Sequence, residues 1–138
     1  GKEGAELIFD QKIGSQSYND NRWTGIKDDI FLDIDLGEPT KITEMEVGAL
    51  KDTQSWIFPP DKIEVLAGNQ PGGLQPVGRL DLPPQEEHEL EVYRYKMDLK
   101  EGKYRYVKIK VYNYGEAPAW HGARGEELWT FLDEVILN

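Results

Sequence analysis

Hydrophobic and polar residues alternate along several short segments of the chain. The clearest case is residues 28–37, DDIFLDIDLG, where four aliphatic side chains alternate with Phe31, Asp33 and Asp35. A period of two predicts a β-strand with one buried face and one face in water. Gly37 and the proline two residues later end the pattern, so this segment predicts a short, half-buried strand.

Seven more segments show the same kind of pattern, and turn-forming sequences such as GEPT, FPPD, GNQPGG, LPPQ and KEGK separate most of them. They are AELIF (5–9), KITEMEVGAL (41–50), DKIEVLAG (61–68), PVGRLDL (76–82), HELEVYRYKMDL (88–99), KYRYVKIKVYNY (103–114) and DEVILN (133–138). No long helical periodicity competes with them. Eight short strands at this spacing predict an all-β, antiparallel sandwich or jelly roll.

Length and composition predict one folded domain over residues 1–138. A chain of 138 residues and 15.8 kDa can bury one core but is short for two. Apolar residues make up 38% and aromatic residues 11%, which is too much for a disordered segment. There is no internal repeat, and the flexible GNQPGGLQP segment is a loop between strands.

The net charge of the chain limits the classes of partner that it can bind. With 26 acidic and 16 basic residues, the net charge is −10, and repulsion from phosphates argues against nucleic acid and against an anionic membrane surface. No apolar run approaches the roughly 20 residues of a membrane span, so we expect a soluble chain without membrane insertion. The absence of cysteine excludes disulfides, thiolate metal sites and cysteine nucleophiles. A neutral ligand or a cation fits best.

The most unusual chemistry lies in residues 117–135, APAWHGARGEELWTFLDEV. A sugar presents an apolar C–H face and a ring of hydroxyls, so a sugar site needs an aromatic platform with donors and acceptors around it. Trp120, His121 and Arg124 supply these types. The alternative is that Trp120 and Trp129 cap the end of the sandwich while Arg124 pairs with a nearby carboxylate.

Proline and glycine divide this segment into two parts. Pro118 and two glycines keep residues 118–125 out of regular structure, whereas residues 128–137 are apolar enough to enter the core and finish as a strand. We therefore predict that the first half faces a ligand and that the second half, with Trp129 and Phe131, fills the core.

Three long segments together resemble the discoidin (coagulation factor 5/8 type C) superfamily. More narrowly, they are similar to family 32 carbohydrate-binding modules and to the C-terminal modules of bacterial chitobiases and β-hexosaminidases. The most specific parts are RYVKIKVYNYG followed by Ala-Trp-His and a closing DEVIL, and SWIFPPDKIEV. The segments are residues 7–26, 29–68 and 102–138, so the resemblance spans nearly the whole chain.

The resemblance implies an eight-stranded antiparallel jelly-roll β-sandwich, galactose-binding-domain-like, whose loops at one end bind a terminal galactose- or hexosamine-type sugar. It also implies an extracytoplasmic location and covalent linkage to other domains, such as a glycoside hydrolase. It does not imply catalysis. One departure is Asp10-Gln11, which stands where the family usually has an Asp-Gly turn.

By the same resemblance, the segment KDTQSWIF at residues 51–58 corresponds to a loop that supplies polar sugar contacts. Asp52 and Gln54 would then bond to hydroxyls, and Trp56 would be a second platform. The alternative is that Trp56 packs beneath the rigid turn that follows it. With the residues above, the predicted carbohydrate site comprises Asp52, Trp56, Trp120, His121 and Arg124.

The resemblance further implies one structural calcium ion. Calcium takes six to eight oxygen ligands at about 2.3–2.6 Å. The corresponding ligands here are the carbonyls around Lys12 and Ser15 and the side chain of Glu134. A position that often carries an acidic ligand in the family is Gly14 in this chain.

An enzymatic role finds no support in the residue pattern. Glycoside hydrolysis needs two carboxylates about 5–5.5 or 6.5–9.5 Å apart, and nothing singles out a pair among 26 acids. His88 lies among acidic residues and is predicted to be a solvated surface residue. We therefore predict a non-catalytic carbohydrate-binding module. The alternative is a structural or protein-interaction module that packs on a neighbouring domain without binding sugar.

Overall fold

The computed structural model describes residues 5–10, 16–18, 28–88 and 90–138. In these residues the chain forms seven strands and one short 3-10 turn, η1 (Thr53–Ser55), and no α-helix. The all-β prediction is confirmed. The strands are β1 (Ala5–Asp10), β2 (Gln16–Tyr18), β3 (Ile30–Asp52), β4 (Lys62–Gly68), β5 (Gln75–Asp81), β6 (Leu90–Tyr112) and β7 (Phe131–Leu137).

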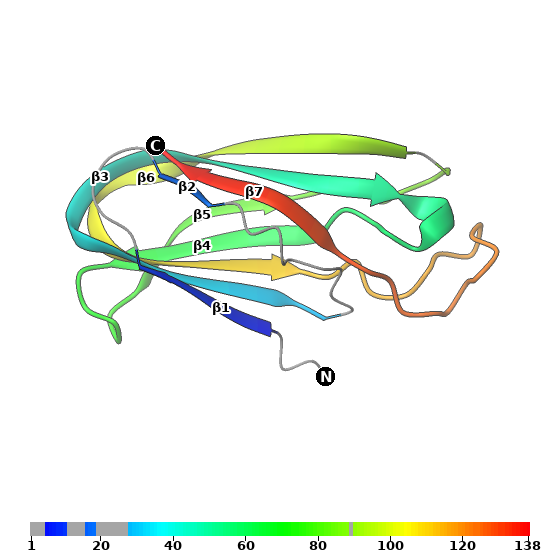
Figure 1. Ribbon diagram of the computed structural model, residues 1–138, viewed down its shortest axis with the longest axis horizontal. Helices are drawn as coiled ribbons and strands as arrows, with labels where there is room; N and C mark the ends of the chain where they lie inside the picture. Colours follow the sequence, from blue (N-terminus) through cyan, green and yellow to red (C-terminus); the bar gives the residue numbers. More distant parts are fainter. Residues whose placement is uncertain (1–4, 11–15, 19–27, 89) are drawn as a thin grey trace.

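The strands form one sheet that folds over on itself. Its order is β2-β7-β3-β6-β4-β5, with β1 joined to β3 in parallel and the other pairs antiparallel. Figure 1 shows β3 and β6 bending sharply at one end of the molecule. One layer therefore holds β2, β7, the second half of β3 and the first half of β6, and the other holds the remaining strands. This is a sandwich-like architecture.

Irregular pairing accounts for the bend. The register between β3 and β6 shifts between Asp35 and Thr40 and again between Ile42 and Glu44, and such bulges bend and twist a strand. Gly37 has φ of 87°, a left-handed conformation that glycine adopts without steric cost. Its N–H donates to the Asp35 carboxylate at 2.8 Å. The turn predicted at GEPT is therefore a corner within one continuous strand.

The same effect changes the strand count. Residues 28–37 and 41–50, predicted as two strands, both contribute to β3, and residues 88–99 and 103–114 both contribute to β6. The sequence did not predict β2, which lies outside the eight segments with strand-like alternation. The described residues thus hold seven strands rather than the predicted eight.

The core lies between the two layers and follows the alternation seen in the sequence. The aliphatic residues of the first strand pattern are all buried, and they pack with the inward-facing residues of β4, β6 and β7. Each fully buried aliphatic side chain contributes about 1.5–3 kcal/mol. A second, smaller cluster is formed by Phe58, Ala117 and Leu128, with Tyr114 and Trp120 packed against it. Most of its residues belong to the connection between β6 and β7, which lies at the end opposite the bend (Figure 1).

Candidate functional site

The two segments that carry the predicted sugar-binding residues are neighbours in the structure. Ile57 makes isolated bridges to Asp52 and Trp129. The Trp129 N–H donates to the Trp56 carbonyl at 2.8 Å, and the Phe58 N–H donates to the Trp129 carbonyl at 3.0 Å. The loop after β3 and the connection before β7 therefore form one surface. We call it the loop end.

Trp56 is the most exposed aromatic platform among the predicted residues. Its side chain is 36% exposed, and its backbone has φ of 64° and ψ of 25°. Among the described residues it is the one non-glycine residue with positive φ. A bulky L-residue rarely adopts this conformation, and the strain costs of the order of 1–3 kcal/mol. The alternative that Trp56 packs beneath the following turn is not what the structure shows, since Phe58 and the two prolines after it are buried there instead.

His121 has a different place from the one predicted. The residue is 5% exposed, its Nε2 lies 2.5 Å from the Thr53 carbonyl oxygen, and its Nδ1 lies 3.0 Å from the Ala123 backbone nitrogen. Because Nδ1 accepts from an N–H, the ring proton is on Nε2, which donates to Thr53. Both ring nitrogens are occupied by the backbone. His121 therefore holds the loops together, which corrects the prediction that it donates to a ligand.

His88 is exposed, as the sequence predicted, and it also contacts residues of the site. Its Nδ1 lies 3.0 Å from the Thr53 hydroxyl. Its ring centroid is 5.0 Å from that of His121 and 5.0 Å from that of Trp120, edge-on to the latter. Both histidines of the chain thus hydrogen-bond to one buried threonine, Thr53. His121 bonds to its carbonyl, and His88 bonds to its hydroxyl. The partners are 68 and 35 residues apart in sequence, so no local pattern indicated this cluster.

Trp120 is partly buried and its polar edge is occupied. The indole Nε1–H donates to the Gln85 carbonyl at 2.8 Å, and the ring stacks on Phe58 with centroids 6.0 Å apart. The ring also belongs to the small cluster at the loop end. This arrangement fits the alternative in which Trp120 caps the end of the sandwich. Gln85, which the sequence did not single out, fixes its orientation.

Asp52 and Arg124 keep their side chains at the surface of the loop end. Asp52 ends β3, is partly exposed and makes no side-chain capping bond to η1. Arg124 lies in a turn in which its N–H donates to the His121 carbonyl at 3.1 Å, and its side chain is exposed. Within the part of the chain that the structure describes, no ion pair of Arg124 is found. The alternative in which Arg124 pairs with a carboxylate therefore has no observed partner.

The second half of residues 117–135 fills the core through other residues than predicted. Leu128 and Thr130 are buried, whereas Trp129 and Phe131 are only half-buried. Asn113 determines which residues of this segment face inward, because its amide donates to the Leu128 carbonyl at 2.9 Å and to the Thr130 hydroxyl at 3.1 Å. The expectation that Trp129 and Phe131 fill the core is wrong, because their neighbours at positions 128 and 130 are buried in their place. The irregular structure predicted for residues 118–125 is confirmed.

The predicted calcium ligands fall largely outside the described residues. Lys12 and Ser15 lie outside them, and of Glu134 only the backbone in β7 is described. The pairing of β7 with β3 is irregular at this point, because three residue positions from Leu132 to Val135 face only two from Ala49 to Val47. No group of three acidic or histidine side chains suited to a metal occurs among the described residues. The calcium ion stays a prediction.

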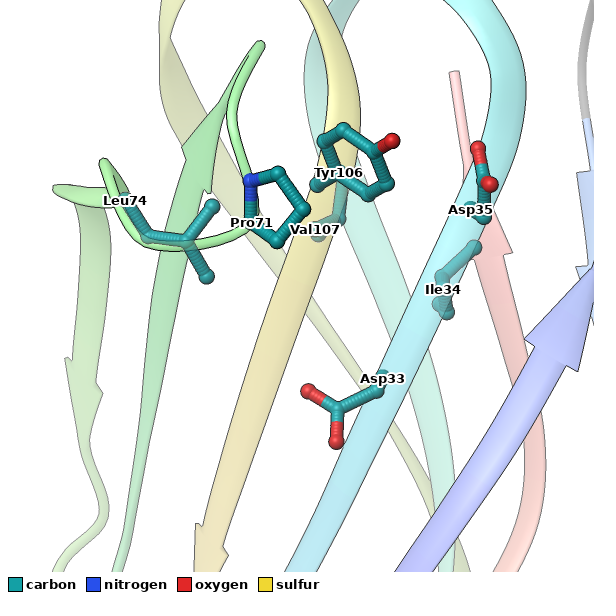
Figure 2. A pocket seen from close by; sticks show the side chains of 7 residues that line it. All are labelled: Asp33, Ile34, Asp35, Pro71, Leu74, Tyr106 and Val107. Atoms are coloured by element: carbon teal, nitrogen blue, oxygen red, sulfur yellow. The ribbon is translucent and has the colours of Figure 1, made fainter.

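A hollow of about 240 Å³ lies near the bend, away from the loop end. Figure 2 shows Pro71 and Leu74, from the loop between β4 and β5, beside Tyr106 of β6 and across from Asp33 and Asp35 of β3. The loop is anchored by a further residue, Asn69, which bonds to the backbone of β6 at 3.0 and 3.1 Å.

Both carboxylates at this hollow have cationic partners. Asp35 accepts two bonds from the Arg105 guanidinium at 2.8 and 3.0 Å, and this pairing, with the Gly37 N–H, holds the pKa of Asp35 below its usual value. The Lys108 ammonium lies 3.5 Å from Asp33. The polar groups here join neighbouring strands, so we do not place the candidate site at the bend.

Comparisons with known proteins do not place the chain in a family. A scan against protein-family models gave no match, and a search of curated protein sequences gave none either. The described residues contain no helix with the length and apolar character needed to cross a membrane. What the chain does must therefore follow from its side chains and their arrangement.

Proposed function

We propose that this chain is a non-catalytic carbohydrate-binding module whose loop end captures a terminal sugar. The observation that carries the proposal is Trp56, an exposed aromatic ring held at the surface by a strained backbone. Strained residues concentrate at functional sites because surrounding structure must maintain them. A ring fixed in this way meets the apolar face of a sugar with little loss of side-chain freedom.

Polar groups around Trp56 fit the same role. The Thr53 carbonyl accepts from the Trp56 N–H at 3.2 Å and from His121, so one buried residue connects the two segments of the site. Asp52 offers an acceptor for sugar hydroxyls, and Arg124 offers donors. His121 fixes the loop that presents them.

The resemblance to the discoidin superfamily supports the finer features of this proposal. They are an eight-stranded jelly roll, a galactose- or hexosamine-type ligand, an extracytoplasmic location and linkage to other domains of a longer protein such as a glycoside hydrolase. Weak and reversible capture of sugar would raise the effective concentration of a linked enzyme at its substrate. The chain itself would contribute binding and no chemical step.

The structural calcium ion belongs to the same proposal and has its own test. A ligand that binds only the folded state stabilises it by RT ln(1 + [L]/Kd). Addition of EDTA should therefore lower the melting temperature, and millimolar calcium should restore it. Equal melting temperatures in both conditions would remove the ion from the proposal.

A glycan array followed by isothermal titration tests sugar binding. We expect Trp56→Ala to weaken the best array hit at least about tenfold, which corresponds to 1.4 kcal/mol, while Trp56→Phe retains most of the affinity. Tyr106→Ala, at the hollow near the bend, is the matched aromatic control and should bind as the parent does. Equal affinity of parent and Trp56→Ala would show that the loop end is not the platform.

Leu90 favours a second candidate function, a module that packs on a neighbouring domain. It is 73% exposed, and with Trp56 it is one of two exposed large hydrophobic residues among those described. It pairs with Asp52 in the register of β3 and β6, so it lies beside the candidate site. If the module binds sugar, Leu90→Ser leaves the affinity unchanged. A protein-docking surface is favoured if no glycan binds at all.

A further inference from the structure

We infer that His121 makes the loop end sensitive to pH, because it holds the turn that carries Arg124 at neutral pH and releases that turn in mild acid. The turn comprises residues 118–125, and the His121 ring joins it to η1. Arg124 is an exposed residue of this turn, and its backbone N–H donates to the His121 carbonyl at 3.1 Å. The position of Arg124 therefore depends on the conformation of the turn.

The hydrogen bonds of His121 fit one protonation state of its ring. Nδ1 lies 3.0 Å from the Ala123 backbone nitrogen, whose N–H can only donate, so Nδ1 is without a proton. Nε2 lies 2.5 Å from the Thr53 carbonyl oxygen, which can only accept, so Nε2 carries the proton. The ring is therefore neutral in the closed turn. A second proton can bind only at Nδ1, where it would point at the Ala123 N–H.

The surroundings of the ring disfavour a positive charge. His121 is 5% exposed, and burial disfavours the charged form of an imidazole. Its ring contacts are with Phe58 and Trp120, with centroids 5.8 Å away, and with His88, at 5.0 Å. Protonation of His88 would add a like charge beside it. Among the residues that the structure describes, no carboxylate bonds to the His121 ring.

Charged side chains occur on each element around His121, and most of them lie at the surface. They are Asp52 before η1, Glu86 and Glu87 on the connection from β5 to β6, and Glu116, Arg124, Glu126 and Glu127 on the connection from β6 to β7. Solvent screens such as these from a buried ring. The buried Lys51 of β3 is also a cation, and its ammonium lies 5.9 Å from the Tyr93 ring centroid. It therefore offers no compensation for a charge on His121.

Proton binding and closure of the turn oppose each other. The closed turn holds no proton at Nδ1, whereas an open turn, with the ring in water, can take one. The closed form is therefore favoured at high pH and is lost as the pH falls. Histidine is the side chain that ordinarily changes its charge between about pH 5 and 8, so the transition belongs in this range.

The turn can open while the sandwich stays folded. The small cluster beneath it is separate from the main core between the two layers. A Cβ added at Gly122 or Gly125 would meet nothing within 4 Å, so the backbone there has open space beside it. Segments with few buried contacts open at a lower free energy than the core does. Acid should therefore displace Arg124 and leave the sheet in place.

The effect on sugar rests on the proposed function, whereas the opening of the turn can be measured without any ligand. NMR of the side-chain nitrogens of the 15N-labelled chain reports the tautomer and the charge of each histidine. At about pH 7.5 we expect His121 to be neutral with its proton on Nε2. On lowering the pH to about 5, we expect the Ala123 and Arg124 amide signals to shift as His121 takes its proton. The amides of Val65 and Ile109, in the core, should not shift.

Two NMR results would overturn the inference. One is protonation of His121 without any change at the Ala123 amide, which would mean that the turn stays closed around a charged ring. The other is a ring proton on Nδ1 at neutral pH. These measurements use the parent chain, so they decide the inference even where a variant at position 121 is unstable.

Isothermal titration with the best glycan-array hit tests the consequence for binding. We expect the affinity of the parent to be at least about fivefold lower at about pH 5 than at about pH 7.5. The amide of His121→Gln can still donate to Thr53 and accept from Ala123 but does not titrate, so this variant should bind with little dependence on pH. His88→Gln is the matched control, which removes the exposed histidine and should keep the pH dependence of the parent.

The outcomes separate this inference from the proposed function. Loss of the pH dependence in His88→Gln but not in His121→Gln would overturn the role of His121 and leave sugar binding intact. A parent affinity that does not change with pH would overturn the link between the turn and the ligand. If no glycan binds at any pH, the proposed function fails, and the NMR titration alone decides whether His121 controls the turn.

Discussion

The two ends of this molecule use polar side chains in different ways. At the bend, Asp35 is paired with Arg105 and bonded to the Gly37 N–H, and Asn69 ties a loop to β6. At the loop end, the buried His121 hydrogen-bonds to the backbone, whereas Trp56 and Arg124 extend to the surface. The ion pair at the bend joins neighbouring strands, whereas the buried hydrogen bonds at the loop end hold loops that carry exposed side chains. The second arrangement is what a binding surface requires.

The largest expected effect comes from the small cluster under the loop end. Phe58 is fully buried against Tyr114 and Trp120, so Phe58→Ala should lower the free energy of unfolding by about 3–5 kcal/mol. Leu90→Ala is the control, because its side chain is 73% exposed and should change stability by less than about 0.5 kcal/mol. Chemical denaturation measures both. A small effect at Phe58 would mean that the loops do not depend on this cluster.

The second-largest expected effect distinguishes a residue with a structural role from a residue that contacts the ligand. His121→Ala should lower the free energy of unfolding by about 1–3 kcal/mol, because the Ala123 N–H loses its partner and the Thr53 carbonyl keeps its bond from the Trp56 N–H but loses the one from His121. Arg124→Ala, on an exposed side chain, should leave stability unchanged and weaken sugar binding. Thermal melts and isothermal titration on the two variants check this contrast. A stable His121→Ala variant that loses sugar affinity would restore a direct contact for this histidine.

A smaller effect measures the strain at Trp56. Trp56→Gly and Trp56→Ala both remove the ring, but only glycine adopts the left-handed backbone without steric cost. We expect the glycine variant to be more stable than the alanine variant by about 1 kcal/mol, with both equally weak for sugar. Equal stability of the two variants would indicate that the turn relaxes when the ring is removed.

The smallest effect concerns the bend and depends on pH. The pKa of Asp35 is lowered in the folded state by Arg105. Its stabilising contribution is therefore present above the unfolded-state pKa of about 3.9 and is lost as pH falls through the lower folded-state value. Asp35→Asn should melt at a lower temperature than the parent at pH 7, and the gap should close in acid. Sugar affinity at pH 7 should be the same for both.

The sequence predicted those features that depend on near neighbours. Alternation along residues 28–37 identified both a strand and its buried face, because a period of two is a local property. Merging that strand with the next one depended on Gly37 and on register shifts against β6, which are set by pairing with distant residues. The core position of Leu128 rather than Trp129 depended on Asn113, fifteen residues away.

The candidate site divides in the same way. Arg124 was predicted from its residue type and the glycines around it, and Trp56 from the family resemblance of its segment; the structure places both at the surface. The contacts of His88 and His121 with Thr53 join residues that are 35 and 68 positions apart in the sequence. Such contacts depend on the closed tertiary structure and leave no mark in a short window of sequence.

The continuity of β3 and β6 has a consequence for how the domain folds. Each of these strands contributes to both layers, so neither layer can be completed while the other is unformed. Unfolding should therefore be a single cooperative transition. Pairings such as Asp52 with Leu90 and Ile30 with Val111 join residues far apart in the chain, and a topology with so many distant contacts folds slowly, in milliseconds to seconds for domains of this class.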